Sequence, residues 1–141
     1  MRPDYAQQYS VYEANHWWFR ARRIILKSLL EQHVPWNDGM EVLEVGTGPG
    51  ANLSALYPAA ASVVGLEPDE RNSGIASRIS GRQVFHGSLE KLPPPLAGKR
   101  FDVIALFDVL EHIERDTYTL ALLRTMLKPD GRLVLTVPAY Q

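Results

Sequence analysis

The sequence of 141 residues contains no cysteine, which excludes disulfide bonds, thiol catalysis and thiolate metal sites. Its net charge at pH 7 is only -1, so no overall field would draw the chain to nucleic acid or to anionic lipid. No apolar run approaches the roughly 18 residues of a membrane-spanning helix, and the polar N-terminus lacks the apolar core of a signal peptide. We therefore expect a cytoplasmic protein without a nucleic-acid or membrane partner.

The first 38 residues are predicted to be a separate helical segment, residues 1–38. Apolar residues recur there with helical spacing and are expected to face the core, whereas Arg22 and Lys27 are expected to be solvated. The members of this apolar stripe are Trp18, Ala21, Ile25 and Leu29. Pro35 and the turn-forming residues 37–39 then end the helical pattern.

From residue 39 onward, strand-like and helix-like segments alternate, which predicts a second unit at 39–141. The expected strands are 40–45, 62–66, 83–86, 101–107 and 133–137. The expected helices are 51–57, 69–79 and 116–127, with a turn at 129–131. This alternation predicts an α/β fold with a doubly wound parallel sheet. In such sheets ligands bind beyond the carboxyl ends of the strands, so the residues just after each strand carry the functional prediction.

A glycine-rich turn follows the first expected strand, in the string EVGTGPG at 44–50. Glycines allow positive φ angles and let the backbone approach a ligand closely, and the next helix presents free amides. Two alternatives stay open at this point. The turn could simply join a strand to a helix, or, with Ala51 completing G-x-G-x-x-A, it could bind a dinucleotide.

Glu67 ends the second expected strand, 21 residues after Gly46. An acidic side chain at this place can accept hydrogen bonds from both ribose hydroxyls of a nucleoside that lies across the sheet. The alternative is a solvated residue that opens the following helix beside Pro68. The distance from Gly46 favours the ribose interpretation.

Four strings occur in a characteristic order: EVGTGPG, LEPD at 66–69, FDVIALFDVLEHI at 101–113 and LKPDGRLVLTVPA at 127–139. Together they resemble the class I S-adenosylmethionine-dependent methyltransferases, in the small-molecule branch related to ubiquinone-biosynthesis enzymes. The string HWWFRARR at 16–23 also resembles leaders of this branch. The resemblance implies a Rossmann-like sheet of seven strands in the order 3-2-1-4-5-7-6. This chain would supply five of them, in the order 3-2-1-4-5, and we expect a core truncated after the fifth strand.

The resemblance also implies how S-adenosyl-L-methionine, or its product S-adenosyl-L-homocysteine, is held. Glu44 and the turn backbone would hold the methionine part, and Glu67 would hold the ribose. Phe107 and Asp108 would lie beside the sulfonium end. The turn residues concerned are Gly46, Thr47, Gly48 and Gly50, and those bordering the adenine are Gly87, Ser88 and Leu89. Ser88 departs from the family, which commonly has Asp there, so its contact with the adenine should be weaker.

Asp108, Glu111 and His112 are the candidate catalytic residues, because the resemblance puts this string where the methyl group should point. His112 could remove a proton from the acceptor, since an imidazole ordinarily titrates near neutrality. Alternatively, Asp108 and Glu111 form a capping box at a helix start, which we favour over catalysis. A divalent metal held by the three side chains is the least favoured alternative.

The aromatic and basic N-terminal cluster offers a lid over the ligand pocket. Tyr9, Trp17 and Arg20 are the candidates, and they would admit a flat or anionic small-molecule acceptor. At the other end, the strand 133–137 would be an apolar edge with unpaired backbone groups, so a homodimer through this edge is expected.

Two further functions remain as alternatives to a methyltransferase. An NAD-dependent oxidoreductase would use the same sheet and a similar glycine turn, although Glu44 and the string at 108–113 speak against it. A catalytically silent module that binds the cofactor or dimerises is the third hypothesis.

Overall fold

The structure, a computed structural model, describes residues 3–139, and five of its segments form one parallel sheet. The strands are β1 (Glu41–Val45), β2 (Ser62–Glu67), β3 (Gln83–His86), β4 (Phe101–Phe107) and β5 (Leu127–Thr136). Their spatial order is β3-β2-β1-β4-β5. The predicted Rossmann-like α/β fold and strand order are thus confirmed.

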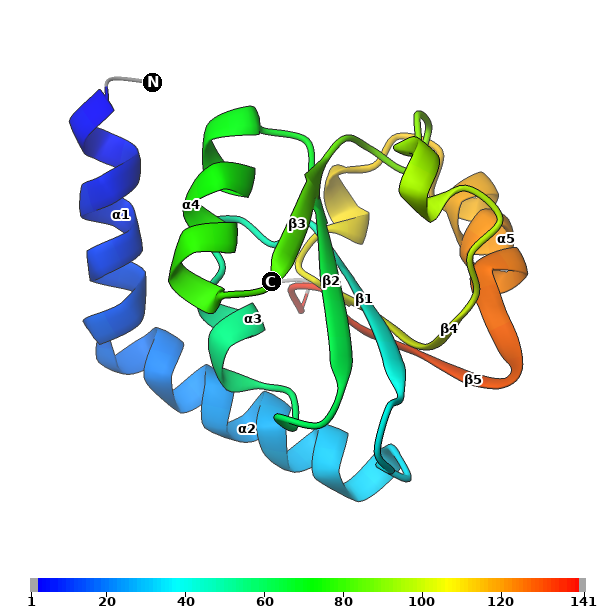
Figure 1. Cartoon of the computed structure of the whole chain (residues 1–141). Helices are drawn as coiled ribbons and strands as arrows, with labels where there is room; N and C mark the ends of the chain where they lie inside the picture. Colours follow the sequence, from blue (N-terminus) through cyan, green and yellow to red (C-terminus); the bar gives the residue numbers. More distant parts are fainter. Residues whose placement is uncertain (1–2, 140–141) are drawn as a thin grey trace.

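Helices cover both faces of this sheet (Figure 1). On one side lie α1 (Pro3–Asn15), α2 (Trp17–His33), α3 (Ala51–Ala55) and α4 (Glu70–Ser80). On the other lie α5 (Asp116–Met126) and two short 3-10 helices, η1 (Pro94–Leu96) and η2 (Leu110–His112). Within the described part of the chain, no helix has the length and apolar character needed to cross a membrane.

The core consists of two apolar layers separated by the sheet. The first holds Leu26 and Leu30 of α2 with Leu53 of α3, and the second holds Leu123 and Met126 of α5. β4 lies between β1 and β5 and contributes to both layers, with the side chains from 103 to 106 fully buried. This double burial is the reason for its continuous apolar sequence.

β5 is longer than predicted. The expected strand began at residue 133, after a turn at 129–131, but β5 already begins at Leu127, directly after α5. Phe101 pairs with Leu127 and Val103 with Arg132, so extra residues are accommodated as an irregularity within β5. The predicted turn at 129–131 is therefore wrong: these residues belong to β5, and their pairing with β4 is irregular.

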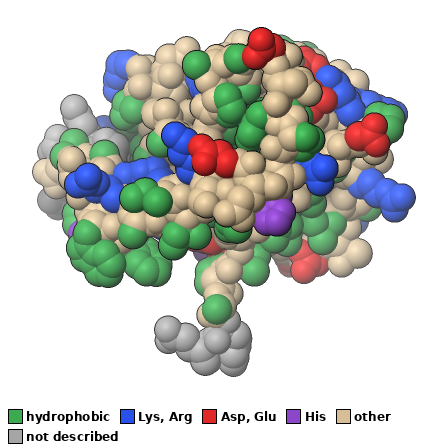
Figure 2. All heavy atoms as spheres, turned by 90° about the horizontal axis from the view of Figure 1, so that it is seen from below, with side chains coloured by type: hydrophobic (Ala, Val, Ile, Leu, Met, Phe, Trp, Pro, Cys, Tyr) green, Lys and Arg blue, Asp and Glu red, His purple; other side chains and the backbone are tan. Residues whose placement is uncertain are grey.

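The orientation predicted for α2 is wrong. The side chains of Trp18, Ile25 and Leu29 are 56%, 60% and 43% exposed, while Leu26 and Leu30 are buried. Apolar residues occur side by side in this helix, as in 24–26 and 29–30, so two different faces satisfy the helical period. Figure 2 shows hydrophobic side chains gathered at the lower left, where α1 and α2 meet.

Candidate functional site

A cleft of about 390 Å³ lies beyond the carboxyl ends of the first four strands. Its walls come from the loops after β1, β2, β3 and β4, which is the position predicted from the strand order. The predicted site residues that line it are Gly46, Glu67, Gly87, Ser88, Leu89, Asp108 and His112. The structure therefore brings together residues from three of the four sequence strings, those at 44–50, 66–69 and 101–113, and from the loop after β3.

The glycine turn has the backbone that only glycine adopts readily. Gly46, Gly48 and Gly50 have φ angles of 72°, 52° and 94°. A Cβ atom on Gly46 would lie 2.5 Å from Cγ2 of Val109, whereas one on Gly48 would meet nothing within 4 Å. The space beside Gly48 is therefore open, although Gly48 is not among the residues that line the cleft, while Gly46 lines the cleft and is required by packing against the loop after β4.

Glu67, the last residue of β2, links this strand to the glycine turn that follows β1. Its Oε2 accepts a hydrogen bond from the backbone N–H of Gly48 (2.8 Å), and its Oε1 accepts one from that of Asp69 (3.0 Å). Burial raises the pKa of the Glu67 carboxyl, although the two backbone donors oppose this effect. The carboxyl group is thus held in one orientation at the cleft wall, beside the glycine turn.

The loop after β3 forms another wall of the cleft. The N–H of Gly87 donates to the backbone oxygen of Glu67 (3.0 Å), which fixes this loop to β2. The Ser88 hydroxyl oxygen accepts a bond from the N–H of Lys91 (3.2 Å), and Leu89 is buried. Ser88 therefore has a local hydrogen-bond partner in its own loop.

Asp108 does not cap a helix, so the favoured capping-box interpretation is wrong. Its φ angle is 55°, in the left-handed region, and η2 has no side-chain cap. The carboxylate points to α2 and β5 instead. Oδ2 lies 2.7 Å from Nη2 of Arg22, and Oδ1 accepts a hydrogen bond from the Thr136 hydroxyl (3.0 Å). Arg22, which was expected to be solvated, ties the N-terminal segment to this wall of the cleft.

Glu111 and His112 follow in η2. The His112 side chain is 78% exposed although it lines the cleft, and its Nε2 lies 3.9 Å from Oε1 of Glu111. Among the residues that the structure describes, no group of three or more His, Asp or Glu side chains is placed to hold a metal ion. His112 therefore lies at the mouth of the cleft.

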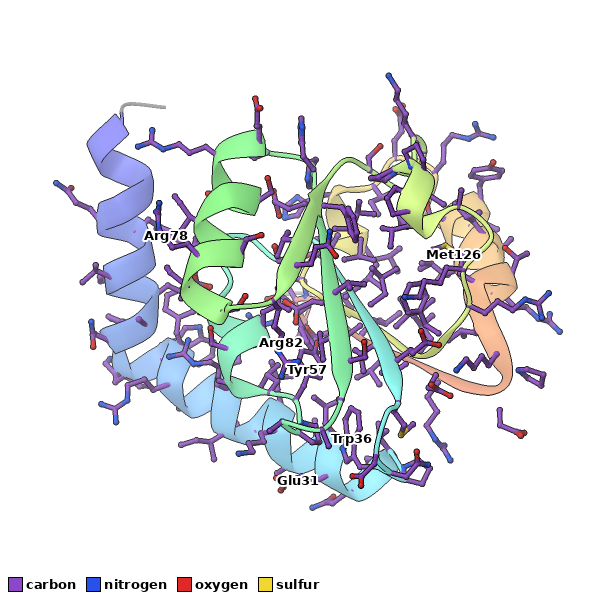
Figure 3. The ribbon with its side chains drawn as sticks, viewed as in Figure 1. Glu31, Trp36, Tyr57, Arg78, Arg82 and Met126 are labelled. Carbon is purple, nitrogen blue, oxygen red and sulfur yellow. The ribbon has the colours of Figure 1, made fainter. Side chains whose placement is uncertain are left out.

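Glu44 lies outside this cleft, beneath the glycine turn on the α3 side of the sheet. It is 1% exposed, and its Oε2 accepts a hydrogen bond of 2.6 Å from the Tyr57 hydroxyl. Burial raises the pKa of the Glu44 carboxyl to about 8. Figure 3 shows Tyr57 in the same region as Trp36 and Arg82. Trp36 meets the tyrosine ring edge to face.

Other predicted site residues also lie outside the walls of this cleft. Thr47 is buried, and its hydroxyl donates to the backbone oxygen of Gly48. Phe107 is buried in the core layer under α2 and α3. Gly50 approaches α4, where an added Cβ would lie 2.7 Å from the Cα of Ala76.

The candidate lid residues do not line the cleft. Trp17 is 70% exposed and Tyr9 41%, and α1 packs against α2 and α3. The corner between α1 and α2 instead meets the turn from its other side. There, Ala14 and Arg23 share a pocket of about 220 Å³ with Pro49 and Ala51 of the turn region. The lid role of Tyr9, Trp17 and Arg20 stays a prediction.

Sequence reasoning missed several residues of the site. Val109, Ile113 and Thr119 line the cleft, and Arg22 and Thr136 hold Asp108. Val109 is the second residue after a predicted strand, so its position was a usable signal. Arg22 and Thr136 are 114 residues apart in sequence, and nothing in the local pattern of either pointed to the other.

Comparisons with known proteins agree on one family. A family model described as a methyltransferase domain matches residues 14–141. The ubiquinone biosynthesis O-methyltransferase of Rhizobium rhizogenes is 33% identical over 97 residues, which are 67% of this chain and 39% of that protein. The chain therefore spans well under half the length of this curated relative.

Solved structures show the same fold. The PH0226 protein from Pyrococcus horikoshii is 25% identical with a TM-score of 0.72, and the match covers 96% of this chain and 66% of that one. The plantazolicin methyltransferase BpumL, solved in complex with S-adenosylhomocysteine, is 16% identical with a TM-score of 0.74. That match covers 94% of this chain and 52% of the other.

Proposed function

This chain belongs to the class I S-adenosylmethionine-dependent methyltransferase family, and we propose that it binds S-adenosylmethionine in the cleft for methyl transfer to a small-molecule acceptor. The observation that carries the proposal is the placement of Glu67. Its carboxyl group lines the cleft and is fixed by two backbone donors, one of them in the glycine turn. Each carboxylate oxygen keeps a free lone pair, so the two oxygens can accept hydrogen bonds from both ribose hydroxyls.

The two ends of the cofactor would bind to different loops. The adenine would lie against Leu89 and Ser88, and the amino-acid tail would follow the backbone of the turn beside Gly48, where no side chain intervenes. Glu44 would act at this end from beneath the turn. Ser88 has an acceptor oxygen to offer the adenine amino group, but without a charge the contact is weaker than that of an aspartate.

S-adenosylmethionine supplies a methyl group on a sulfonium that is already activated for transfer. The protein has to align the acceptor with this group and remove a proton where the acceptor carries one. The mouth of the cleft combines apolar side chains, Val109 and Ile113, with the exposed imidazole of His112. We assign His112 the role of proton acceptor, with Glu111 beside it and Asp108 behind it as part of the wall.

Binding is tested with a matched pair of glycine variants. Gly48 and Gly39 both have positive φ angles, 52° and 78°, and an added Cβ would meet nothing within 4 Å at either position. Gly48→Val and Gly39→Val should each lose about 1–2 kcal/mol of stability, because both force a side chain into the left-handed region. Only Gly48→Val should lose affinity for S-adenosylhomocysteine in calorimetry, because Gly39 precedes β1 at the opposite edge of the sheet.

The same calorimetry separates the competing functions. NAD should give no binding heat, and 5′-methylthioadenosine, which lacks the amino-acid tail, should bind Gly48→Val nearly as well as the unmodified chain. Binding of NAD alone would replace the proposal with the oxidoreductase alternative. Unchanged binding of S-adenosylhomocysteine by Gly48→Val would remove the turn from the site. Cofactor binding without turnover across an acceptor panel would leave a silent binding module.

A further inference from the structure

Glu13, near the C-terminal end of α1, carries a buried carboxyl oxygen that no donor satisfies. Among the side chains that the structure describes, its Oε2 is the one buried oxygen or nitrogen without a hydrogen-bond partner. Burial raises the pKa of the Glu13 carboxyl, and the positive charges of Arg23 and Arg22 oppose this effect. A buried charged acceptor without a donor destabilises a fold, so the position of this carboxyl calls for a physical reason.

The two nearby arginines bond to other acceptors. Arg23 donates from Nη1 to the backbone oxygen of Glu13 (3.1 Å) and from Nη2 to that of Ala14 (3.0 Å). Carbonyl groups at the end of a helix have no helical donor, so Arg23 caps α1 and fixes it to α2. Arg22 is engaged by Asp108. The carboxyl group of Glu13 therefore lies between two cations without a direct bond to either.

The corner between α1 and α2 lies against the glycine turn. Ala14 and Arg23 line a cavity of about 220 Å³ together with residues of the turn region, and both helices pack against α3, which follows the turn (Figure 1). The charge of Glu13 also raises the pKa of Glu44, at the end of β1. In the sheet, β1 lies between β2 and β4, so this place is inside the sheet and not at its β5 edge.

A ligand can reach Glu13 more readily than Glu44. Glu44 is 1% exposed, and its Oε2 already accepts a hydrogen bond from the Tyr57 hydroxyl. Glu13 remains partly exposed, although its Oε2 is enclosed. A carboxylate without a donor is best satisfied by a cationic group that carries several N–H bonds, such as an ammonium. S-adenosylmethionine carries one ammonium group, at the end of the tail that would follow the glycine turn.

We propose that the Glu13 carboxylate receives the ammonium group of the methionine tail, so that the corner between α1 and α2 completes the cofactor site. This inference rests on the proposed function, because it takes the cleft to hold S-adenosylmethionine. The bond is charge-assisted and needs no proton transfer. It also contributes specificity, since a nucleoside without the ammonium leaves the buried carboxylate unpaired.

The test compares three ligands by calorimetry: S-adenosylhomocysteine, its analogue with a butanoate tail, which lacks the ammonium, and its analogue with a propylamine tail, which lacks the carboxylate. Glu13→Gln should lower the affinity for the two ligands that carry the ammonium by about tenfold to a hundredfold, the range for a hydrogen bond to a charged group. The affinity for the butanoate analogue should not change.

Glu31→Gln is the matched control. It removes the same charge from the exposed side of α2, near the other end of that helix (Figure 3). All three affinities should stay as in the unmodified chain. A general effect of lost negative charge would appear in both variants, whereas a bond to the ammonium is lost in Glu13→Gln alone.

Glu13→Met separates binding from folding. Its side chain has a similar length and no group that needs a partner, so the ligand-free variant should melt at a Tm no lower than that of the unmodified chain. It should show the same selective loss of affinity. The unmodified chain gives an answer without any substitution, because it should bind the butanoate analogue about tenfold or more weakly than S-adenosylhomocysteine.

Equal losses for S-adenosylhomocysteine and the butanoate analogue would make Glu13 a structural residue and overturn the proposal. Unchanged affinities in both Glu13 variants would overturn it too, as would equal binding of these two ligands by the unmodified chain. Each of these outcomes leaves the cofactor in the cleft. An unmodified chain that does not bind S-adenosylhomocysteine at all would instead overturn the proposed function, and this inference with it.

Discussion

Asp108 shows why the three candidate catalytic residues are not equivalent. Its carboxylate is engaged by Arg22 and by Thr136, and its backbone is held in the left-handed region at the end of β4. Asp tolerates this conformation better than most residues because its short side chain can bond locally. Asp108 is therefore fixed as part of the wall, while the His112 ring, 78% exposed, is accessible to an acceptor at the mouth of the cleft.

Replacing His112 tests the assignment of the proton acceptor. His112→Ala should lower kcat about 10²–10⁴-fold with an acceptor that must lose a proton, which is the usual contribution of a general base. Its affinity for S-adenosylhomocysteine should not change, since the ring stands at the mouth. His33→Ala, at the end of α2, is the matched control and should retain full activity. Equal activity of the two variants, measured by methyl transfer from labelled cofactor, would reduce His112 to a lining residue.

At the scale of elements, β1 and α3 are joined by a buried acid. Glu44 on β1 and Tyr57, just after α3, form a hydrogen bond of 2.6 Å in the core layer under α2. Burial raises the pKa of Glu44 to about 8, from an ordinary value of 4.5, and the Tyr57 bond opposes this shift. The stability of the β1–α3 unit should therefore depend on pH.

The folded state holds the Glu44 proton more tightly than the unfolded state does. The contribution of Glu44 to the free energy of unfolding should consequently be fully present below pH 4.5, fall as the pH rises, and be lost above about 8. The steepest part should approach about 1.4 kcal/mol per pH unit. Asp102 and Glu41 have lowered pKa values and act in the opposite direction. At more acidic pH these two carboxyl groups become protonated, and the stabilising contribution of their charged forms is lost.

Urea unfolding at several pH values checks this expectation. Glu44→Gln should have a flatter profile between pH 5 and about 8, because the amide cannot ionise but can still accept from Tyr57. Tyr57→Phe should extend the fall to higher pH, since loss of the hydroxyl donor raises the pKa of Glu44 further. A Glu44→Gln profile that parallels that of the unmodified chain would contradict the assignment.

The elements differ in how far the sequence could predict them. β4 was predicted with its observed bounds, because a strand buried on both faces has an unbroken apolar run. The face of α2 was not, because adjacent apolar residues allow two helical stripes and only tertiary packing chooses between them. Likewise, Gly46, Gly87 and Asp108, which line the cleft directly after strands, were predicted. The Arg22–Asp108 pair depends on where α2 lies relative to the end of β4, which no local pattern specifies.

At the scale of the whole molecule, the cleft belongs to no single element. Its walls are the loops after β1, β2, β3 and β4, and they meet because parallel strands end at one edge of the sheet. Hydrogen bonds already join neighbouring loops: Glu67 accepts from Gly48, and Gly87 donates to the backbone of Glu67. A ligand that contacts all four loops would therefore link segments that are distant in sequence.

Such a ligand should stabilise the fold as one cooperative unit. At a free S-adenosylhomocysteine concentration about 100 times its dissociation constant, binding to the folded state alone adds about 2.7 kcal/mol. For a chain of this size, that increment should raise Tm by roughly 5–10 °C. Hydrogen exchange should slow at the amides of Gly48 and Asp69, which Glu67 holds, and also in the sheet, because opening then requires release of the ligand. NAD at the same concentration should leave Tm unchanged. Protection confined to the glycine turn, with no rise in Tm, would mean that the ligand contacts one loop and that the four walls do not form a common site.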